Sequence, residues 1–326
     1  MSKIVTIYGG SGFLGRYIAR RLAKSGWRIR VAVRCPNEAM HVKPYGAVGQ
    51  VEPVFCNIRD DASVRSVMQG ADAVVNCVGT FDRRGRNNFD AVQHEGAERI
   101  ARIASEEGVA HLVHVSAIGA DTDAASEYCK TKALGEEAVT RRFPAAVILR
   151  PSVMFGAEDG FFNRFAAMAR LSPILPIVGA DTRFQPVFVD DVAQAAAAGV
   201  EGWANPGIYE LGGPEIATFR ALMSKMLVFI RRRRLVINIP FAAAGPMAAM
   251  MELGQTLSMG IVPAQITRDQ VKSLKVDNIV GADARGFADL GIEPIALDAV
   301  LPDYLWRFRP AGQYEAIKES AGNLRT

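Results

Sequence analysis

A glycine-rich turn between the first predicted strand and the first predicted helix constrains this chain more than any other feature. The β-rich run Ile4 to Tyr8 is followed by Gly9-Gly10-Ser11-Gly12-Phe13-Leu14-Gly15, and a helical pattern then extends from Phe13 to Lys24. Glycine permits the positive φ of a tight turn, and the missing Cβ leaves room for a pyrophosphate beside the helix N-terminus, whose dipole favours negative charge. The strand–turn–helix context therefore predicts a dinucleotide site rather than a simple tight turn.

The first 150 residues alternate short apolar strands with helix-length segments. After the first strand, β-branched runs recur at residues 28–33, 51–56, 73–78, 111–116 and 146–150. Strands that are hydrophobic throughout and separated by helices are typical of a parallel sheet covered on both faces. The sequence therefore predicts an α/β fold with a Rossmann-type doubly wound parallel sheet over residues 1–150. Beyond Pro151 the alternation weakens, and we expect a smaller C-terminal α+β lobe over residues 151–326, interleaved with the core, with a tail from about residue 310.

Composition excludes several classes of protein. With 49% hydrophobic and 22% charged residues, the chain can bury a large core and is not disordered. Its net charge of +4 is too small and dispersed to favour nucleic-acid binding. The four cysteines show neither disulfide nor metal-ligand spacing, so we expect a reducing compartment and no metal. The longest apolar stretch, residues 241–251, is interrupted by Gly245-Pro246 and is shorter than the ~20 residues of a membrane span.

The ends of the predicted strands supply candidate contacts to the nucleotide, because ligands of open α/β sheets bind beside the carboxyl ends of the strands. Arg34 follows the second strand, where its guanidinium suits the 2′-phosphate of NADP(H) better than the free hydroxyl of NAD(H). Asn57 and the next backbone N–H can contact adenine. The predicted cofactor-binding residues are Gly9, Ser11, Gly12, Phe13, Leu14, Arg16, Arg34, Asn57, Ile58, Cys77, Val78, Gly79, Ser116, Tyr128, Lys132, Pro151 and Val153.

Three of these residues also form an apparent catalytic set. Ser116 ends the fifth predicted strand, and Tyr128 and Lys132 lie four residues apart, on one face of a predicted helix. In a reductase, the lysine lowers the pKa of the tyrosine, which then gives a proton to a carbonyl that the serine polarises. Tyrosine and lysine also hydrogen-bond the nicotinamide ribose. The same set therefore suits either catalysis or cofactor binding alone.

Several segments resemble a known family. The glycine turn, the Ser116/Tyr128/Lys132 set and the segment at residues 150–156 resemble the extended or atypical branch of the short-chain dehydrogenase/reductase (SDR) superfamily. A narrower similarity, over nearly the whole chain, is to the nucleotide-binding accessory subunit of respiratory complex I (NADH:ubiquinone oxidoreductase). It rests on residues 12–17, 34–36, 151–159, 185–189, 266–271 and 289–292.

This resemblance implies a tightly bound, non-catalytic NADPH in a subunit that stabilises the peripheral arm near the membrane and the quinone site. Its partners would be other complex I subunits at the base of that arm. The location implied is the cytoplasmic face of a bacterial inner membrane, or the matrix side of the inner mitochondrial membrane. Arg231 to Arg234 and the apolar segment after them would face anionic lipid headgroups or a partner, with a solvated helix end and a core helix as the alternative.

The residues are also compatible with two other functions. One is an active NADPH-dependent atypical SDR reductase or epimerase that acts on a small carbonyl or a sugar nucleotide. Against it stands the stretch between Gly156 and Arg183, which has few polar residues to line a substrate pocket; its bulky members are Phe161, Phe162, Phe165, Leu171 and Leu175. The other is a nucleotide sensor that binds NADPH reversibly and regulates a partner.

Overall fold

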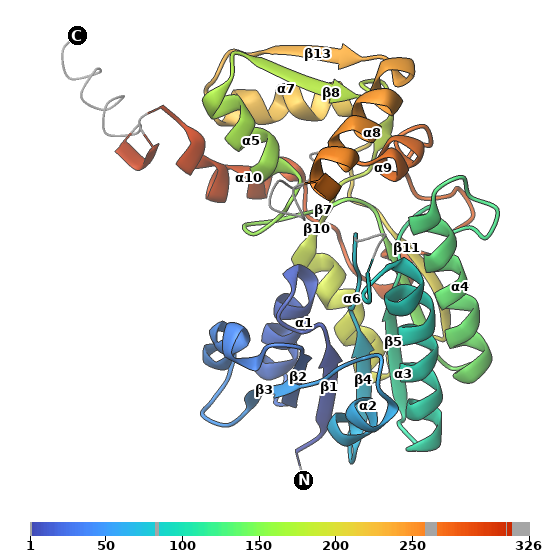
Figure 1. The fold of residues 1–326 in the computed structure, drawn as a ribbon. Coiled ribbons are helices and arrows are strands. Elements are labelled where there is room, and N and C mark those ends of the chain that lie inside the picture. Colours follow the sequence, from blue (N-terminus) through green and yellow to red (C-terminus); the bar gives the residue numbers. More distant parts are fainter. Residues whose placement is uncertain (1, 82–84, 258–265, 311, 315–326) are drawn as a thin grey trace. The chain divides into compact units, whose positions relative to one another are not determined.

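The computed structural model describes residues 2–81, 85–257, 266–310 and 312–314, which form two compact units (Figure 1). The first unit comprises residues 1–152, 189–212 and 280–294, and the second comprises residues 153–188, 213–279 and 295–326. The chain therefore passes between the units five times, and the expected division at residue 150 lies close to the first passage. Most of the predicted tail, residues 311 and 315–326, lies outside the described residues.

A seven-stranded parallel sheet, in the order β11-β6-β5-β4-β1-β2-β3, forms the centre of the first unit. Its strands are β1 (Ile4–Tyr8), β2 (Arg28–Val33), β3 (Val51–Phe55), β4 (Ala73–Asn76), β5 (His111–Val115), β6 (Val147–Pro151) and β11 (Gly207–Leu211). The strand order reverses between β1 and β4, which is where doubly wound sheets bind their ligands. The predicted fold class is confirmed.

Helices cover both faces of this sheet (Figure 1). On one face α1 (Phe13–Lys24) packs against α6 (Val189–Glu201). The other face carries α2 (Asp61–Met68), α3 (Glu95–Glu106) and α4 (Glu127–Arg142), whose inner residues share one buried cluster with the sheet. Because helices lie on both sides, the strands β1, β4 and β6 are mostly apolar and buried on both faces.

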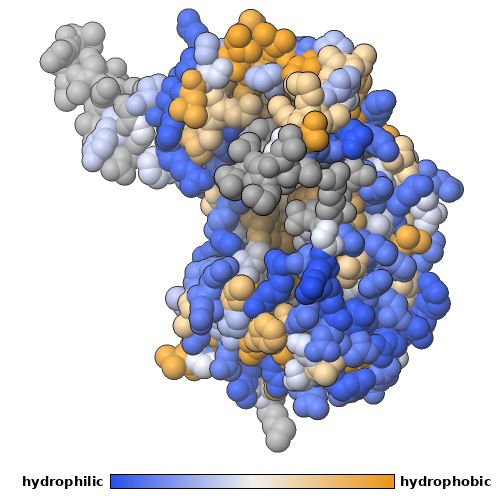
Figure 2. Space-filling model, viewed as in Figure 1, coloured by the Kyte–Doolittle hydropathy of each residue, from blue (hydrophilic) through white to orange (hydrophobic). Residues whose placement is uncertain are grey.

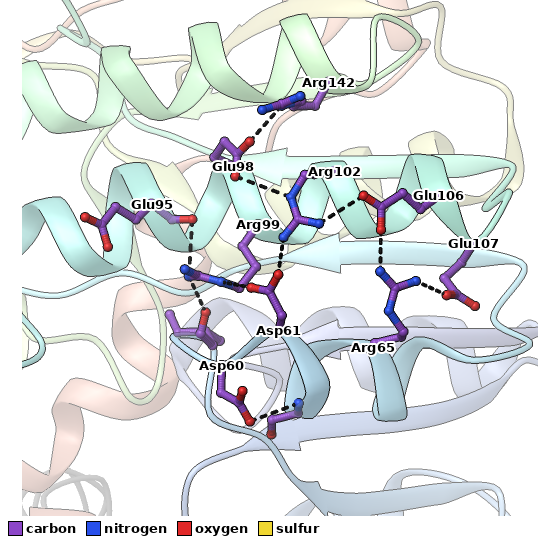
Figure 3. A network of polar contacts seen from close by, with 12 residues as sticks. Asp60, Asp61, Arg65, Glu95, Glu98, Arg99, Arg102, Glu106, Glu107 and Arg142 are labelled. Carbon is purple, nitrogen blue, oxygen red and sulfur yellow. Dashed lines mark hydrogen bonds and ion pairs between the residues drawn. The ribbon is translucent and has the colours of Figure 1, made fainter.

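Ion pairs connect the outer surfaces of α2, α3 and α4 (Figure 3). Asp61, in the first turn of α2, accepts hydrogen bonds of 2.5 Å from both Arg99 and Arg102 of α3, which lowers the pKa of its carboxyl group. Arg142 of α4 pairs with Glu98 of α3 at 2.7 Å. These pairs are solvent-exposed, so each contributes little to stability. Their acidic and basic groups are already partnered within the chain.

Strand β11 was not predicted from the sequence. It pairs in parallel with β6, from Gly207 opposite Val147 to Leu211 opposite Pro151, and extends the sheet at that edge. Because more than 50 residues separate β6 from β11, the pairing leaves no local signal in the sequence.

The second unit is built around an aromatic core and three small two-stranded sheets. Its elements are β7 (Met154–Phe155), α5 (Phe162–Leu171), β8 (Ile174–Val178), β9 (Arg183–Phe184), β10 (Val187–Phe188), β12 (Ala217–Thr218), α7 (Phe219–Phe229), β13 (Leu235–Ile239), α8 (Phe241–Leu257), α9 (Arg268–Ser273) and α10 (Leu297–Leu305).

Most of the bulky residues between Gly156 and Arg183 belong to this core. Phe161 stacks on Phe219 with 5.5 Å between ring centroids and meets Phe162 and Phe165 edge-on at 5.0 and 5.7 Å. Leu175 is buried in the same cluster. Leu171 differs, since 83% of its surface is exposed. The aromatic side chains therefore stabilise the unit.

The four-arginine run does not form a continuous basic patch. Arg232 donates from Nε to the Phe308 carbonyl at 2.9 Å, and Arg234 donates from Nε to the Ala169 carbonyl at 2.7 Å. Arg231 and Arg233 are exposed. Two of the four guanidinium groups are therefore hydrogen-bonded to the backbone of this unit.

Apolar side chains also remain on the surface of the second unit. On β8 and β13, Ile174 lies opposite Leu235 and Pro176 opposite Ile237, and all four are exposed. Figure 2 shows hydrophobic side chains gathered on this part of the unit. On α8, Ala244 and Ala248 are buried, whereas 72% of Met250 is exposed. Among the described residues, no helix is both long enough and apolar enough to cross a membrane.

Candidate functional site

The glycine turn after β1 is a tightly packed backbone structure. Gly9 has a φ of +75°, and a Cβ on this residue would lie 3.2 Å from the backbone of Cys77 and Val78. A Cβ on Gly15 would lie 2.5 Å from the Gly9 carbonyl oxygen and 2.6 Å from the Gly10 Cα. The turn, the start of α1 and the end of β4 are therefore in direct contact, and glycine is required at both positions.

The N-terminus of α1 lies directly after this turn. Gly12 occupies the N-cap position, and no side chain caps the helix there. The guanidinium of Arg16 donates to the carbonyl oxygens of Ser11 at 3.1 Å and of Gly12 at 3.3 Å, so this positive charge lies against the turn. Phe13 and Leu14 open the helix, and Leu14 is buried. An uncapped N-terminus with a nearby arginine suits a phosphate group.

In the sheet, β2 and β3 lie on one side of β1, and β4 lies on the other. Arg34 follows β2 and is exposed to solvent. After β3, the Asn57 backbone N–H donates to Ser63 Oγ at 2.9 Å, and its side-chain Oδ1 accepts from the Arg59 N–H at 3.2 Å. Ile58 packs against the sheet–helix core. These contacts fix the conformation of the loop. Among the described residues, the two N–H groups of the Asn57 side-chain amide form no hydrogen bond, so they can donate to a ligand.

The end of β4 passes beside the glycine turn. Cys77 donates its backbone N–H to the Tyr8 carbonyl at 2.9 Å, and Val78 donates to Asn76 Oδ1 at 3.1 Å. Burial raises the pKa of the Cys77 thiol to about 12, so this thiol is not a nucleophile. A Cβ added to Gly79 would lie 3.8 Å from Lys132 Nζ, which brings the lysine to the end of this strand.

The predicted catalytic residues lie directly after β5 and in the first two turns of α4. Ser116 follows β5 and is almost completely buried. Lys132 is also buried and donates from Nζ to the Val115 carbonyl at 3.0 Å, and burial lowers its pKa to about 8. The Tyr128 ring stacks on Phe81 and meets Phe89 edge-on. Burial raises the pKa of Tyr128, so its hydroxyl stays protonated.

The last two predicted residues fall in different units. Pro151 is the final residue of β6, and its carbonyl accepts from the Ile118 backbone N–H at 3.1 Å. Val153 belongs to the second unit, where its N–H donates to Asn278 Oδ1 at 3.1 Å. In the first unit, the other predicted residues follow the carboxyl ends of five neighbouring strands or lie on α1 and α4.

Two residues at this edge of the sheet were not predicted. Asn76 and His114 lie opposite each other on β4 and β5 and form a buried pair, with Asn76 Nδ2 3.1 Å from His114 Nδ1. Polar residues near the ends of two otherwise apolar strands were the available signal. Among the residues that the structure describes, no group of three or more His, Cys, Asp or Glu side chains could hold a metal ion.

This chain is similar to known proteins in both sequence and fold. A profile of the NAD dependent epimerase/dehydratase family matches residues 5–212. The chain is 34% identical over 316 residues to the mitochondrial NADH dehydrogenase [ubiquinone] 1 alpha subcomplex subunit 9 of Arabidopsis thaliana, across 95% of this chain and 79% of that protein. It is 32% identical over 195 residues to a ceramide reductase of Caulobacter vibrioides, across 60% of each chain.

The solved structures agree on the architecture. A dTDP-glucose 4,6-dehydratase from Streptomyces venezuelae, solved with NAD and TYD bound, aligns with a TM-score of 0.71 over 96% of this chain and 99% of that one. The two sequences are 19% identical, so this likeness concerns the fold alone.

Proposed function

We propose that this chain, which belongs to the NAD dependent epimerase/dehydratase family and within it to the family of alpha subcomplex subunit 9 of NADH dehydrogenase, is an accessory subunit of NADH:ubiquinone oxidoreductase. The observation that carries the proposal is the extent of the similarity. It covers 95% of the chain and therefore includes both units.

The chain binds a nicotinamide dinucleotide at the carboxyl edge of the first unit's sheet. The uncapped start of α1 takes the pyrophosphate, and the glycine turn leaves room for it. Asn57 and Ile58 lie beside the adenine, whereas Ser116, Tyr128 and Lys132 hold the nicotinamide end. We assign NADPH as the natural form because Arg34, exposed at the end of β2, supplies a guanidinium for a 2′-phosphate.

Arg34→Leu is expected to lower the affinity for NADPH about tenfold, because it removes a charge-assisted hydrogen bond to the 2′-phosphate. The affinity for NADH, which lacks that phosphate, is expected to stay unchanged. Titrating each reduced nucleotide while following nicotinamide fluorescence measures both. Arg28→Leu is the matched control, since Arg28 is exposed at the opposite end of the same strand. An equal loss for NADPH and NADH would remove Arg34 from the 2′-phosphate site.

The nucleotide serves a structural role in this proposal. Phe161, Phe162 and Phe165 pack in the core of the second unit. The segment between Gly156 and Arg183 therefore offers few polar side chains that could bind a sugar nucleotide or a small carbonyl. A permanently bound nucleotide stabilises the first unit, because a ligand that binds only the folded state shifts folding towards it.

An active NADPH-dependent reductase is the second candidate, because Ser116, Tyr128 and Lys132 are all present and Tyr128 keeps its proton. The similarity to the ceramide reductase covers 60% of the chain, less than the subunit similarity does. Sustained oxidation of NADPH with a carbonyl substrate, lost in Tyr128→Phe, would favour this candidate over the first.

The second unit is the part that would face the membrane. It carries 16 Lys and Arg against 11 Asp and Glu, a net charge of +5, whereas the first unit has a net charge of −1. Exposed Arg231 and Arg233 and the apolar face of α8 suit anionic lipid headgroups beside a peripheral protein. Within the arginine run, this contact does not depend on Arg232 and Arg234, whose Nε groups donate to backbone carbonyls.

In gently solubilised membranes, the chain is expected to migrate on a native gel with the band that stains for NADH dehydrogenase activity. That band should also release NADPH when it is denatured. Immunodetection of the chain and nucleotide analysis of the excised band provide the two measurements. A chain that migrates alone near its own mass of 35.2 kDa would contradict the accessory-subunit function.

A further inference from the structure

The buried pair of Asn76 and His114 has a defined hydrogen-bond direction. Val78 donates its backbone N–H to Asn76 Oδ1, so the oxygen of the amide faces Val78 and the nitrogen faces His114. An amide nitrogen can only donate, and His114 Nδ1 therefore accepts and carries no proton. The proton of the neutral imidazole must lie on Nε2.

His114 Nε2 is thereby a buried donor that lacks an acceptor. It and Ser116 Oγ are the buried side-chain polar atoms that have no hydrogen-bond partner within the described part of the chain. His114 is 1% exposed and Ser116 is 4% exposed. Buried polar atoms in folded proteins are nearly always paired, often through an internal water.

The two unpartnered atoms belong to side chains that lie near one another at the end of β5. Ser116 directly follows β5 and still pairs with β6, so its side chain and that of His114, two residues earlier, leave the chain on the same face, about 6.5 Å apart at Cα. A water that makes hydrogen bonds of about 2.8 Å to two atoms bridges up to about 5.6 Å between them, which side chains at neighbouring positions on one face can reach. The geometry suits a single bridging water.

We propose that Asn76 and His114 are positioning residues that bind one buried water and, through it, orient the hydroxyl of Ser116. The bonds run in one direction, from Asn76 Nδ2–H to His114 Nδ1, from His114 Nε2–H to the water, and from the water to Ser116 Oγ. Ser116 then donates its own proton into the nucleotide site, so the ligand atom that it meets is an acceptor such as a carbonyl or carboxamide oxygen. This last step rests on the proposed function.

The surroundings keep the imidazole neutral. Lys132 is the charged group that acts on it, and the neighbours of Lys132 are Glu136 on the same helix and Cys77 after β4. Burial, together with the positive charge of Lys132, lowers the pKa of His114 to about 3. Protonation of Nδ1 would also place two donors against each other, because Asn76 already donates there.

Nitrogen-15 NMR of the full chain, without nucleotide, tests the hydrogen-bond direction. His114 is expected to stay neutral, with its proton on Nε2, between about pH 5 and pH 7, where an ordinary histidine titrates. A proton on Nδ1, or titration near the ordinary pKa of about 6.5, would overturn the proposal. Because this measurement needs no nucleotide, its outcome is independent of the proposed function.

A pair of variants tests the positioning role. His114→Gln can accept from Asn76 and donate from its other end, and is expected to keep the affinity for NADPH within about threefold of the original. His114→Leu keeps the bulk but removes both hydrogen bonds, and a loss of about tenfold is expected. Circular dichroism confirms that both variants fold. Equal affinities in the two folded variants would overturn the positioning role, whereas an original chain that binds no nucleotide would instead refute the proposed function.

Discussion

Replacing Gly15 by alanine is expected to abolish the retention of bound nucleotide. The new Cβ would lie 2.5 Å from the Gly9 carbonyl oxygen and 2.6 Å from the Gly10 Cα, and both of these are backbone atoms that cannot turn aside. The turn must therefore move away from α1, and the N–H groups at the helix start lose their position. We expect the affinity for NADPH to fall about a hundredfold, because a hydrogen bond to a charged group contributes about 1.5–3 kcal/mol and each 1.4 kcal/mol is a factor of ten. Titration of NADPH, and the nucleotide released by denaturing the purified protein, measure the effect.

Gly245→Ala is the matched control for this substitution. Gly245 lies within α8 of the second unit, and apart from its own stretch of the helix no described residue has an atom within 4 Å of the position that its Cβ would take. Alanine there should leave nucleotide retention intact and favour the helix by about 0.5–1 kcal/mol. If Gly15→Ala kept as much nucleotide as Gly245→Ala, the nucleotide could not be bound at the glycine turn.

Arg150→Met is expected to destabilise the first unit by about 3 kcal/mol, the cost of leaving a buried carboxylate without its partner. Arg150 binds Glu136 through three hydrogen bonds, from Nε to Oε1 at 2.9 Å and to Oε2 at 3.1 Å, and from Nη2 to Oε2 at 2.6 Å; it also reaches Glu210 at 3.3 Å. The Glu136 side chain is 5% exposed, so water cannot replace the guanidinium. Chemical denaturation followed by circular dichroism measures the change in the free energy of unfolding.

Arg142→Met tests whether burial is the cause. Arg142 also pairs with a glutamate, Glu98 at 2.7 Å, but 49% of its side chain is exposed and its partner is reached by solvent. Its removal should leave the unfolding midpoint nearly unchanged, because exposed ion pairs contribute little. Equal destabilisation by the two substitutions would show that burial of Glu136 does not determine the cost.

The parts of the fold that depend on local sequence could be predicted residue by residue. The first strand, the glycine turn and the first helix were predicted with the bounds that the structure has, because turn chemistry and helix periodicity are local signals. Strands β3, β4 and β5 end one or two residues earlier than expected. The residues at the carboxyl ends of these strands could therefore be proposed as nucleotide contacts without knowing the order in which the strands pair.

Features that depend on pairing between distant segments could not be predicted. Asn76 and His114 are 38 residues apart, and their contact follows only from the register of β4 against β5. The same applies to β11, whose partner β6 lies far back in the chain. The arginine run is a third example, because its sequence indicates one basic patch while the carbonyls of Phe308 and Ala169 engage two of the four side chains.

The five passages of the chain between the two units have a genetic consequence. A stop codon at residue 188 would spare every predicted nucleotide contact, yet it would delete α6, whose Asp190 receives two 2.8 Å hydrogen bonds from Arg21 of α1. It would also delete β11 and leave the edge of β6 open to pairing with other chains. No single cut in the coding sequence separates one complete unit from the other. The two units can therefore be inherited, fused or lost only together, unlike domains joined end to end.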